Sequence, residues 1–289
     1  MTKHRQFLVI TGCALLAFLA LRSLPDTQCA FLHSDHQPVV VGGVEFCGIN
    51  EEANYYHPKS LQFPVRLNIR LAPSGDKGSL QLIREDGTAY LNHEVALTHT
   101  EKVHLHLRQL GDRLAYIHLH PEAQEDGTWN FQFPPEFSNG NPGGNYQAFV
   151  DFADQRSGRV LLGEAKMNSP TTNGSPATPS ARNQMVSLQT SSQRTGDSAV
   201  IRVKLSGPAG AKLKLQPIMG SLGHAVLMGP MEAQPGYAHM HPSLEGGEYG
   251  EAPSLAFRLR LPAPGVYDFW LNISDGMSDT LHATLTVTR

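Results

Sequence analysis

The sequence is poor in cysteine and in charged residues. Only three Cys occur in 289 residues, and Asp, Glu, Lys and Arg together make up 17% of the chain. The net charge is −3, and no run of Lys or Arg forms a basic stripe. Because a nucleic-acid-binding surface needs clustered cations, we expect no nucleic acid among the partners. The chain has 14 His, so we expect site chemistry based on imidazole rather than on thiolate.

Signatures of nucleophilic catalysis are also missing. No Gly-x-Ser-x-Gly elbow occurs, and the cysteines near the N-terminus offer no nucleophilic arrangement. Three histidines around an open coordination position can activate water on zinc. The sequence shows no well-placed carboxylate for the general base, however, so we expect the protein not to be an enzyme.

Long amphipathic helices are absent from the body of the chain. Short runs with period-two alternation follow one another instead, as in residues 65–69 and 80–83, and each run is closed by Gly, Asp or Pro. This alternation, with turn residues at regular spacing, is typical of an antiparallel β-sandwich or barrel. The expected fold class is all-β.

Residues 1–25 have the pattern of a targeting segment. A basic start at Lys3 and Arg5 precedes an apolar run over residues 7–21, which Arg22 ends. The run is long for the core of a signal peptide and short for a relaxed transmembrane helix. A cleaved signal peptide and a retained anchor in the cytoplasmic membrane therefore both stay open. In either case we expect a periplasmic or other extracytoplasmic location.

Export bears on the cysteines that follow this segment. In an oxidising compartment a disulfide between Cys29 and Cys47 is favoured. The alternative is a pair of free thiols near His33 and His36.

Composition divides the remaining chain into four parts. Residues 26–60 form a polar N-terminal appendage with one short apolar run before a Gly-Gly pair. Strand patterning occupies residues 61–160 and resumes in residues 197–289, so we predict one β-sandwich domain in each range. Residues 161–196 are predicted to be a linker, because their Ser-, Thr- and Pro-rich stretch has too little apolar surface to offset the entropy of ordering.

The two predicted domains share landmarks at a constant offset. A Tyr-x-His-x-His-Pro run contains His118 in the first domain and His239 in the second, 121 positions later (239 − 118). The same offset maps Tyr146, in Gly-Asn-Tyr, onto Tyr267, in Gly-Val-Tyr. Landmarks repeated in the same order indicate an internal duplication.

Each His-x-His-Pro run is predicted to form a hairpin with a preceding strand that also contains histidine. Residues two apart in a strand face the same side. A turn at Gly111 places His104 opposite His118. In the second domain, a hairpin centred between Met231 and Glu232 places His224 opposite His239. Opposed side chains lie about 5 Å apart at Cβ, close enough for two imidazoles to share one ion. The predicted metal ligands are His104, His118, His120, His224, His239, His241 and Met240.

The type of ligand favours copper. The second domain concentrates methionine around its histidines, and thioether with imidazole suits copper, especially Cu(I). The alternative is that these histidines are half-buried strand residues with ordinary hydrogen bonds and that the methionines fill gaps in the core.

The same segments resemble a family of exported bacterial proteins with a YtkA-like or FixH-like immunoglobulin-type sandwich. The resemblance rests on Glu-Lys-Val-His-Leu from Glu101, on the two His-x-His-Pro runs and on Leu-Gln-Pro-Ile-Met-Gly-Ser-Leu-Gly-His ending at His224. Tyr116 and Tyr237 depart from it, because Phe is usual there. The resemblance implies two tandem Ig-like antiparallel β-sandwich domains outside the cytoplasmic membrane, with these histidines as metal ligands.

Together these features predict an exported, membrane-associated protein that binds copper for buffering or transfer. Its expected partners are the metal ion and other envelope or metal-transport proteins, with the membrane reached through the N-terminal segment. The alternative is a structural or protein-interaction module of the cell envelope, in which the histidines only stabilise a hairpin and bind no metal.

Overall fold

The computed structural model describes most of the chain. The described residues are 3–23, 39–41, 44–46, 64–98, 100–110, 116–134, 144–169, 185–191, 193–195, 197–206, 215–230, 236–245, 254–260, 263–274 and 278–289. The chain is divided into two compact units, Met1–Asn50 and Glu51–Arg289. Both predicted sandwiches lie in the second unit.

Within its described residues, the first unit contains one helix and one pair of short strands. Helix α1 (Lys3–Ser23) covers the apolar run of the targeting segment, and β1 (Val39–Val41) pairs antiparallel with β2 (Val44–Phe46). None of the helices in the described ranges has both the length and the hydropathy that a membrane crossing requires. Cys29 and Cys47 lie outside the described residues, so their predicted disulfide stays a prediction.

The first sandwich is a sheet of nine strands that closes around one hydrophobic core. Its strand order is β7-β6-β10-β11-β3-β4-β9-β8, with β5 added beside β10. All neighbours are antiparallel except β11 and β3. The strands are β3 (Pro64–Leu71), β4 (Lys77–Ile83), β5 (Val95–Ala96), β6 (Val103–Gln109), β7 (Tyr116–Leu119), β8 (Glu122–Ala123), β9 (Thr128–Gln132), β10 (Gly144–Asp154) and β11 (Val160–Ser169).

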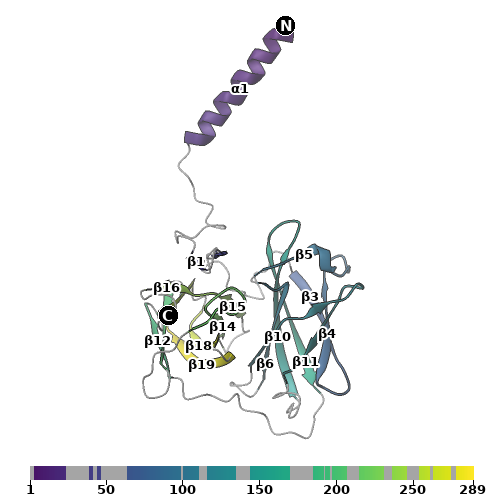
Figure 1. The fold of residues 1–289 in the computed structure, drawn as a ribbon, viewed down its shortest axis with the longest axis vertical. Coiled ribbons are helices and arrows are strands. Elements are labelled where there is room, and N and C mark those ends of the chain that lie inside the picture. Colours follow the sequence, from purple (N-terminus) through teal and green to yellow (C-terminus); the bar gives the residue numbers. More distant parts are fainter. Residues whose placement is uncertain are drawn as a thin grey trace. The chain divides into compact units, whose positions relative to one another are not determined.

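The second sandwich consists of two separate four-stranded sheets, ordered β12-β13-β17-β16 and β15-β14-β18-β19. The strand pairs of both sheets are antiparallel within the described residues. The strands are β12 (Met185–Thr190), β13 (Ser198–Ser206), β14 (His224–Gly229), β15 (Gly236–Met240), β16 (Ser243–Glu245), β17 (Ser254–Arg260), β18 (Gly265–Ser274) and β19 (Ser278–Val287). In Figure 1 the blue-to-teal strands belong to the first sandwich and the green-to-yellow strands to the second.

The two sandwiches have the same topology. The order β7-β6-β10-β11 in the first corresponds to β15-β14-β18-β19 in the second, and β3-β4-β9-β8 corresponds to β12-β13-β17-β16. This is the strand order of an immunoglobulin-type sandwich with one added edge strand. The all-β, Ig-like fold predicted from the sequence is therefore confirmed.

The junction between the two halves of each sandwich differs in detail. In the first sandwich β11 runs parallel to β3, and Gly163 lies at this contact. A Cβ atom at Gly163 would lie 2.7 Å from Leu67 Cδ2, so glycine permits the close approach of the two strands. In the second sandwich a single parallel bridge joins Arg194 to Thr288.

Each sandwich has its own core. One cluster of buried residues, including Trp129 and Phe152, fills the first, and another, including Phe257 and Phe269, fills the second. The landmark Tyr267 lies near the start of β18, and its hydroxyl donates to Ala263 O at 2.8 Å. Such a bond to the backbone just upstream is the tyrosine corner of Ig-type domains.

The predicted linker was too long at both ends. All of β11 except Val160 lies within residues 161–196, yet the strand pairs with β10 in the first sheet. Strand β12 also lies there and pairs with β13 in the second sandwich. The polar composition that suggested a linker is confined to residues outside the described ranges, between these two strands.

Candidate metal centre

The histidines of both sandwiches lie on the outer faces of their sheets, and these faces meet. In β6, Val103, Leu105 and Leu107 point into the core of the first sandwich, so His104 and His106 point away from it. Both histidines are nevertheless fully buried. A third apolar cluster covers them, drawn from both sandwiches: Tyr116, Phe149, Val226, Met228, Tyr237 and Trp270. Each sandwich thus buries the hairpin of the other.

The predicted hairpin register was also wrong by two positions in both sandwiches. His106, not His104, lies opposite His118. Likewise Val226, not His224, lies opposite His239. A shift by two keeps every side chain on its predicted face, because the side-chain period of a strand is two. The histidines therefore still gather on one face.

His224, His239 and His241 form the second-sandwich tripod. His224 Nδ1 lies 3.2 Å from His239 Nε2 and 3.0 Å from His241 Nε2. The edge of a tetrahedron of nitrogens around an ion at 2.0–2.1 Å is about 3.3 Å. The three nitrogens are thus close to the separation at which they can bind one metal ion.

Two hydrogen bonds fix the ring orientations in this tripod. His224 Nε2 lies 3.1 Å from Ile218 O, an acceptor, so it carries the proton and leaves a lone pair on Nδ1. His239 Nδ1 lies 3.2 Å from each oxygen of the Asp151 carboxylate, so it is protonated and leaves a lone pair on Nε2. Histidine ligands of metals are held in this way by a carbonyl or carboxylate on the second nitrogen.

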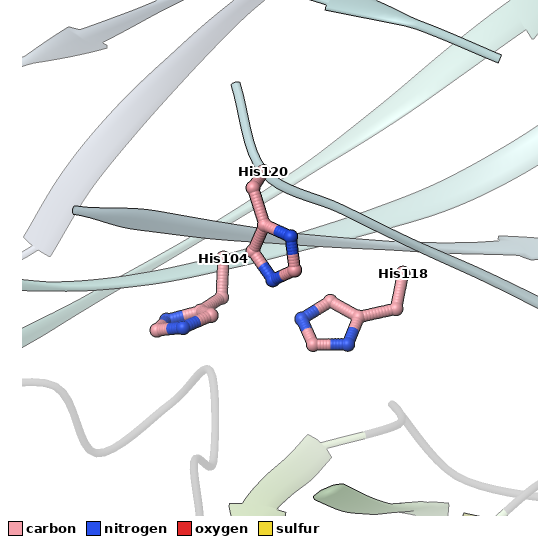
Figure 2. Close-up of side chains that lie close together, drawn as sticks. All are labelled: His104, His118 and His120. Atoms are coloured by element: carbon pink, nitrogen blue, oxygen red, sulfur yellow. The ribbon is translucent and has the colours of Figure 1, made fainter. Parts of the chain in front are cut away.

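His104, His118 and His120 form the first-sandwich tripod. Figure 2 shows their rings converging, and one ligand nitrogen of each lies within 4.8 Å of the others. The ring centroids of His118 and His120 are 4.6 Å apart, and that of His104 lies 5.7 and 5.4 Å from them. The Nε2 atoms of His104, His118 and His120 are buried without a hydrogen-bond partner among the described residues, whereas Nδ1 of His104 faces the Asp151 carboxylate at 3.2 Å.

Such unsatisfied nitrogens distinguish a ligand set from a structural one. A buried polar atom without a partner costs roughly 1–3 kcal/mol, so native proteins rarely leave several together. The sequence does not show whether the histidines are bonded to the backbone or direct their ring nitrogens at one another. In the first tripod the ring nitrogens are directed at one another.

Sequence reasoning missed two members of the cluster, His106 and Asp151. His106 is engaged at both nitrogens, with Tyr116 Oη at 2.9 Å from Nδ1 and Asp151 Oδ2 at 3.2 Å from Nε2. Its spacing from His104 would have placed it on the same face. Asp151 lies opposite His104 on β10, and no sequence motif marks it. The sequence therefore contains no sign that a carboxylate belongs to the cluster.

Asp151 is the one carboxylate among the seven histidines of the candidate ligand groups. His104 Nδ1 lies 3.2 Å from its Oδ1, and Tyr237 donates its hydroxyl to Oδ2 at 3.4 Å. Burial alone would raise the pKa of Asp151, but the neighbouring His239 and His104 and the hydrogen bond from His106 hold that pKa well below its usual range. The group is thus a buried carboxylate at neutral pH.

Most of the surrounding imidazoles are neutral, because burial disfavours their charged form. Burial, followed by the proximity of other histidines, lowers the pKa of His118 well below its ordinary value and that of His120 to about 3. Burial also lowers the pKa of His239 to about 4, although Asp151 opposes the shift. Neutral imidazole is the form that binds a metal ion.

Met240 is not brought to the histidines. Its side chain is fully buried in the core of the second sandwich with Ala225 and Leu227. Met240 follows His239 in β15, and consecutive residues of a strand point to opposite faces. The prediction of Met240 as a ligand is corrected for this reason, and the centre within the described residues is one of imidazoles and a carboxylate.

A polar cavity adjoins the first tripod at His120. The cavity, about 700 Å³ in volume, is lined by His120 together with polar residues such as Arg70, Lys77 and Asn130. His120 is half-buried, whereas His104 is fully buried. A small solute in this cavity therefore reaches the cluster at His120 first.

Comparisons with known proteins identify related domains without assigning a role. Residues 180–289, less than half of the chain, match a family described as a domain of unknown function (DUF8832). The sequence finds no match among curated proteins. 

Two solved structures match about four fifths of the chain. FdeC, an adhesin of Escherichia coli, is 12% identical, with a TM-score of 0.24, over 80% of this chain and 65% of that one. The FN1–FN3 domains of chicken CNTN1 are 10% identical, with a TM-score of 0.22, over 78% of this chain and 66% of that one. This chain thus spans slightly less than two thirds of either structure.

Proposed function

We propose that this is an exported copper-binding protein that holds copper in histidine tripods between its two Ig-like sandwiches and exchanges it with other proteins of the envelope. The observation that supports this most directly is the set of buried, unsatisfied nitrogens on His104, His118 and His120. A second tripod, with rings already oriented by Ile218 O and by Asp151, lies beside the first.

Imidazole nitrogens are good ligands for copper, zinc, nickel and iron, and copper forms the most stable divalent complexes of the first-row series. Without a thioether, the preference for copper rests on this order and on the absence of water-exposed oxygen ligands in either tripod. Cu(I) accepts three imidazoles, whereas zinc in a three-histidine site adds a water molecule. The tripods are proposed to bind the ion, and we assign them no catalytic step.

Exchange of the ion is proposed to pass through His120. This residue lines the polar cavity and is half-buried, whereas His104 of the same tripod is fully buried. An incoming donor or acceptor ligand can therefore approach His120 before the inner histidines release the ion. Export itself is proposed from the basic start and apolar run of residues 1–25.

The second candidate is an interaction module of the cell envelope that binds no metal. The apolar cluster around Tyr116 and Trp270, and the bonds that Tyr237 and His239 donate to Asp151, hold the two sandwiches together without an ion. On this reading the histidine network would only stabilise the interface.

Copper titration separates the two candidates. The full-length chain is titrated anaerobically with Cu(I) in the presence of a competing chelator, and the same titration is run with Zn(II). We expect saturable binding tighter than micromolar, and loss of that binding when His118→Ala and His239→Ala are combined. His93→Ala removes an exposed imidazole outside the cluster and is the matched control. Binding no tighter than micromolar, about 8 kcal/mol, or unchanged in the double variant, would favour the interaction module.

A further inference from the structure

The two sandwiches differ at the position of the Asp151 carboxylate, which the second sandwich does not repeat. In the first sandwich Asp151 lies opposite His104, and in the second Asn272 lies opposite His224. Asn272 donates to Thr280 Oγ1 at 2.6 Å and is half-buried. Two tripods derived from one repeat are therefore served by one acidic side chain.

From this asymmetry we infer that the two tripods form a single dinuclear copper centre, in which Asp151 orients ligands of both ions. The inference rests on the proposed function. It adds the stoichiometry of the centre and a positioning role for a residue outside both tripods, and it makes the second ion depend on a residue of the first sandwich.

Asp151 contacts one ligand of each tripod. Its oxygens lie 3.2 Å from His239 Nδ1, so the other nitrogen of that ring, Nε2, faces the second tripod. Its Oδ1 also lies 3.2 Å from His104 Nδ1, which leaves Nε2 of His104 for the first tripod. The carboxylate is itself held by His106 and Tyr237, so it is fixed in place before any ion arrives.

The tripods are also contiguous. One ligand nitrogen each of His106, His118 and His239 lies within 4.8 Å of the others, although His118 belongs to the first tripod and His239 to the second. The ring centroids of His118 and His239 are 5.5 Å apart, and those of His118 and His224 are 6.1 Å apart. Ions bound in the two tripods would therefore be neighbours within one enclosed space.

Charge supports the same arrangement. Two cations close together in a buried site repel each other strongly, and buried charge persists only when it is compensated. Among the members of the candidate ligand groups, Asp151 alone bears a negative charge. Its place between the tripods lets one carboxylate stabilise both ions.

The test uses the full-length chain with Cu(I) supplied anaerobically from a chelator complex. Wild type is expected to bind two ions per chain. Asp151→Asn keeps the shape of the side chain but removes its charge and one acceptor, and it is expected to weaken both binding steps by about 10–100-fold, the usual effect of losing such an orienting partner.

Asp268→Asn is the matched control. Asp268 is a fully buried carboxylate that also joins the sandwiches, through Arg108, and its ion-pair partners Arg108 and His282 belong to neither tripod. This variant is expected to bind two ions with wild-type affinity. Asp151→Glu restores the charge and is expected to recover part of the lost affinity.

A spectroscopic measurement on wild type is independent of any folding defect in the variants. Loading with two Cu(II) ions is expected to give a spin-coupled electron paramagnetic resonance spectrum. Two uncoupled spectra, a single bound ion, or loss of only one ion in Asp151→Asn would overturn the dinuclear centre while leaving copper binding intact. Failure of wild type to bind any copper would instead refute the proposed function.

Discussion

The ring of Tyr116 stacks on the indole of Trp270, with centroids 4.8 Å apart and an interplanar angle of 19°, although the two residues belong to different sandwiches. Tyr237 packs on Phe149 in the reverse sense, with centroids 4.7 Å apart. Each tyrosine begins the motif of its own sandwich and contacts β10 or β18 of the other. The duplicated faces thus pack on each other in a near-symmetric way, and the histidines lie between them.

Truncation at this interface should separate packing from hydrogen bonding. Tyr116→Ala removes a buried ring and is expected to lower the free energy of unfolding by about 3–5 kcal/mol. Tyr116→Phe keeps the stacking on Trp270 and loses only the hydroxyl bond to His106, so a loss of about 1 kcal/mol is expected. Chemical denaturation of both variants measures the difference, and equal losses would contradict the packing role of the ring.

Met240 provides a direct test of the corrected ligand set. Met240→Leu conserves volume in the core and is expected to cost less than about 1.5 kcal/mol of stability. Its Cu(I) affinity should equal that of wild type, because the side chain points away from His239 and His241. A chelator competition assay measures this affinity, and a tenfold loss would restore Met240 as a ligand.

The stability of the metal-free protein should fall as the pH is lowered below 6.5. His118, His120 and His239 have a folded-state pKa below the unfolded value near 6.5. The unfolded state therefore binds protons first, and stability that is present above pH 6.5 is lost progressively toward pH 4 for His239 and pH 3 for His120.

Each such histidine contributes a slope on the order of 1 kcal/mol per pH unit within its window. Urea denaturation at a series of pH values measures the slope. His118→Gln/His120→Gln should flatten it, whereas the exposed His93→Gln should not. A pH-independent stability of wild type between pH 4 and pH 6.5 would contradict the burial of neutral imidazoles.

The second buried ion pair of the interface should behave as a structural element. Arg108 Nη2 lies 3.3 Å from Asp268 Oδ2, and His282 Nε2 lies 2.9 Å from Oδ1 of the same carboxylate. Removal of one partner from a buried pair typically costs about 3–5 kcal/mol, whereas replacement of both by apolar residues is often nearly neutral. We therefore expect thermal unfolding to show a larger loss of stability for Asp268→Asn than for the double variant Arg108→Met/Asp268→Leu.

The sequence by itself determined the fold class, the duplication and the face on which the histidines lie. These features depend on period-two alternation and on motif order, which are local properties of the chain. The hairpin register was predicted two positions from its observed value, since it depends on turns whose lengths the pattern does not specify. The face of the sheet on which each side chain lies was nevertheless predicted correctly, because a shift of two residues leaves the alternation of faces unchanged.

The tertiary structure alone decided the character of the site. Only the packing of one sandwich on the other converts two surface hairpins into one buried cluster, and no local pattern reports which outer face of a sheet meets another. Asp151 could not be recognised as a member, because its partners His106 and His239 are 45 and 88 positions away in the chain. The sequence contained the ligands, and their convergence came from contacts between residues far apart in sequence.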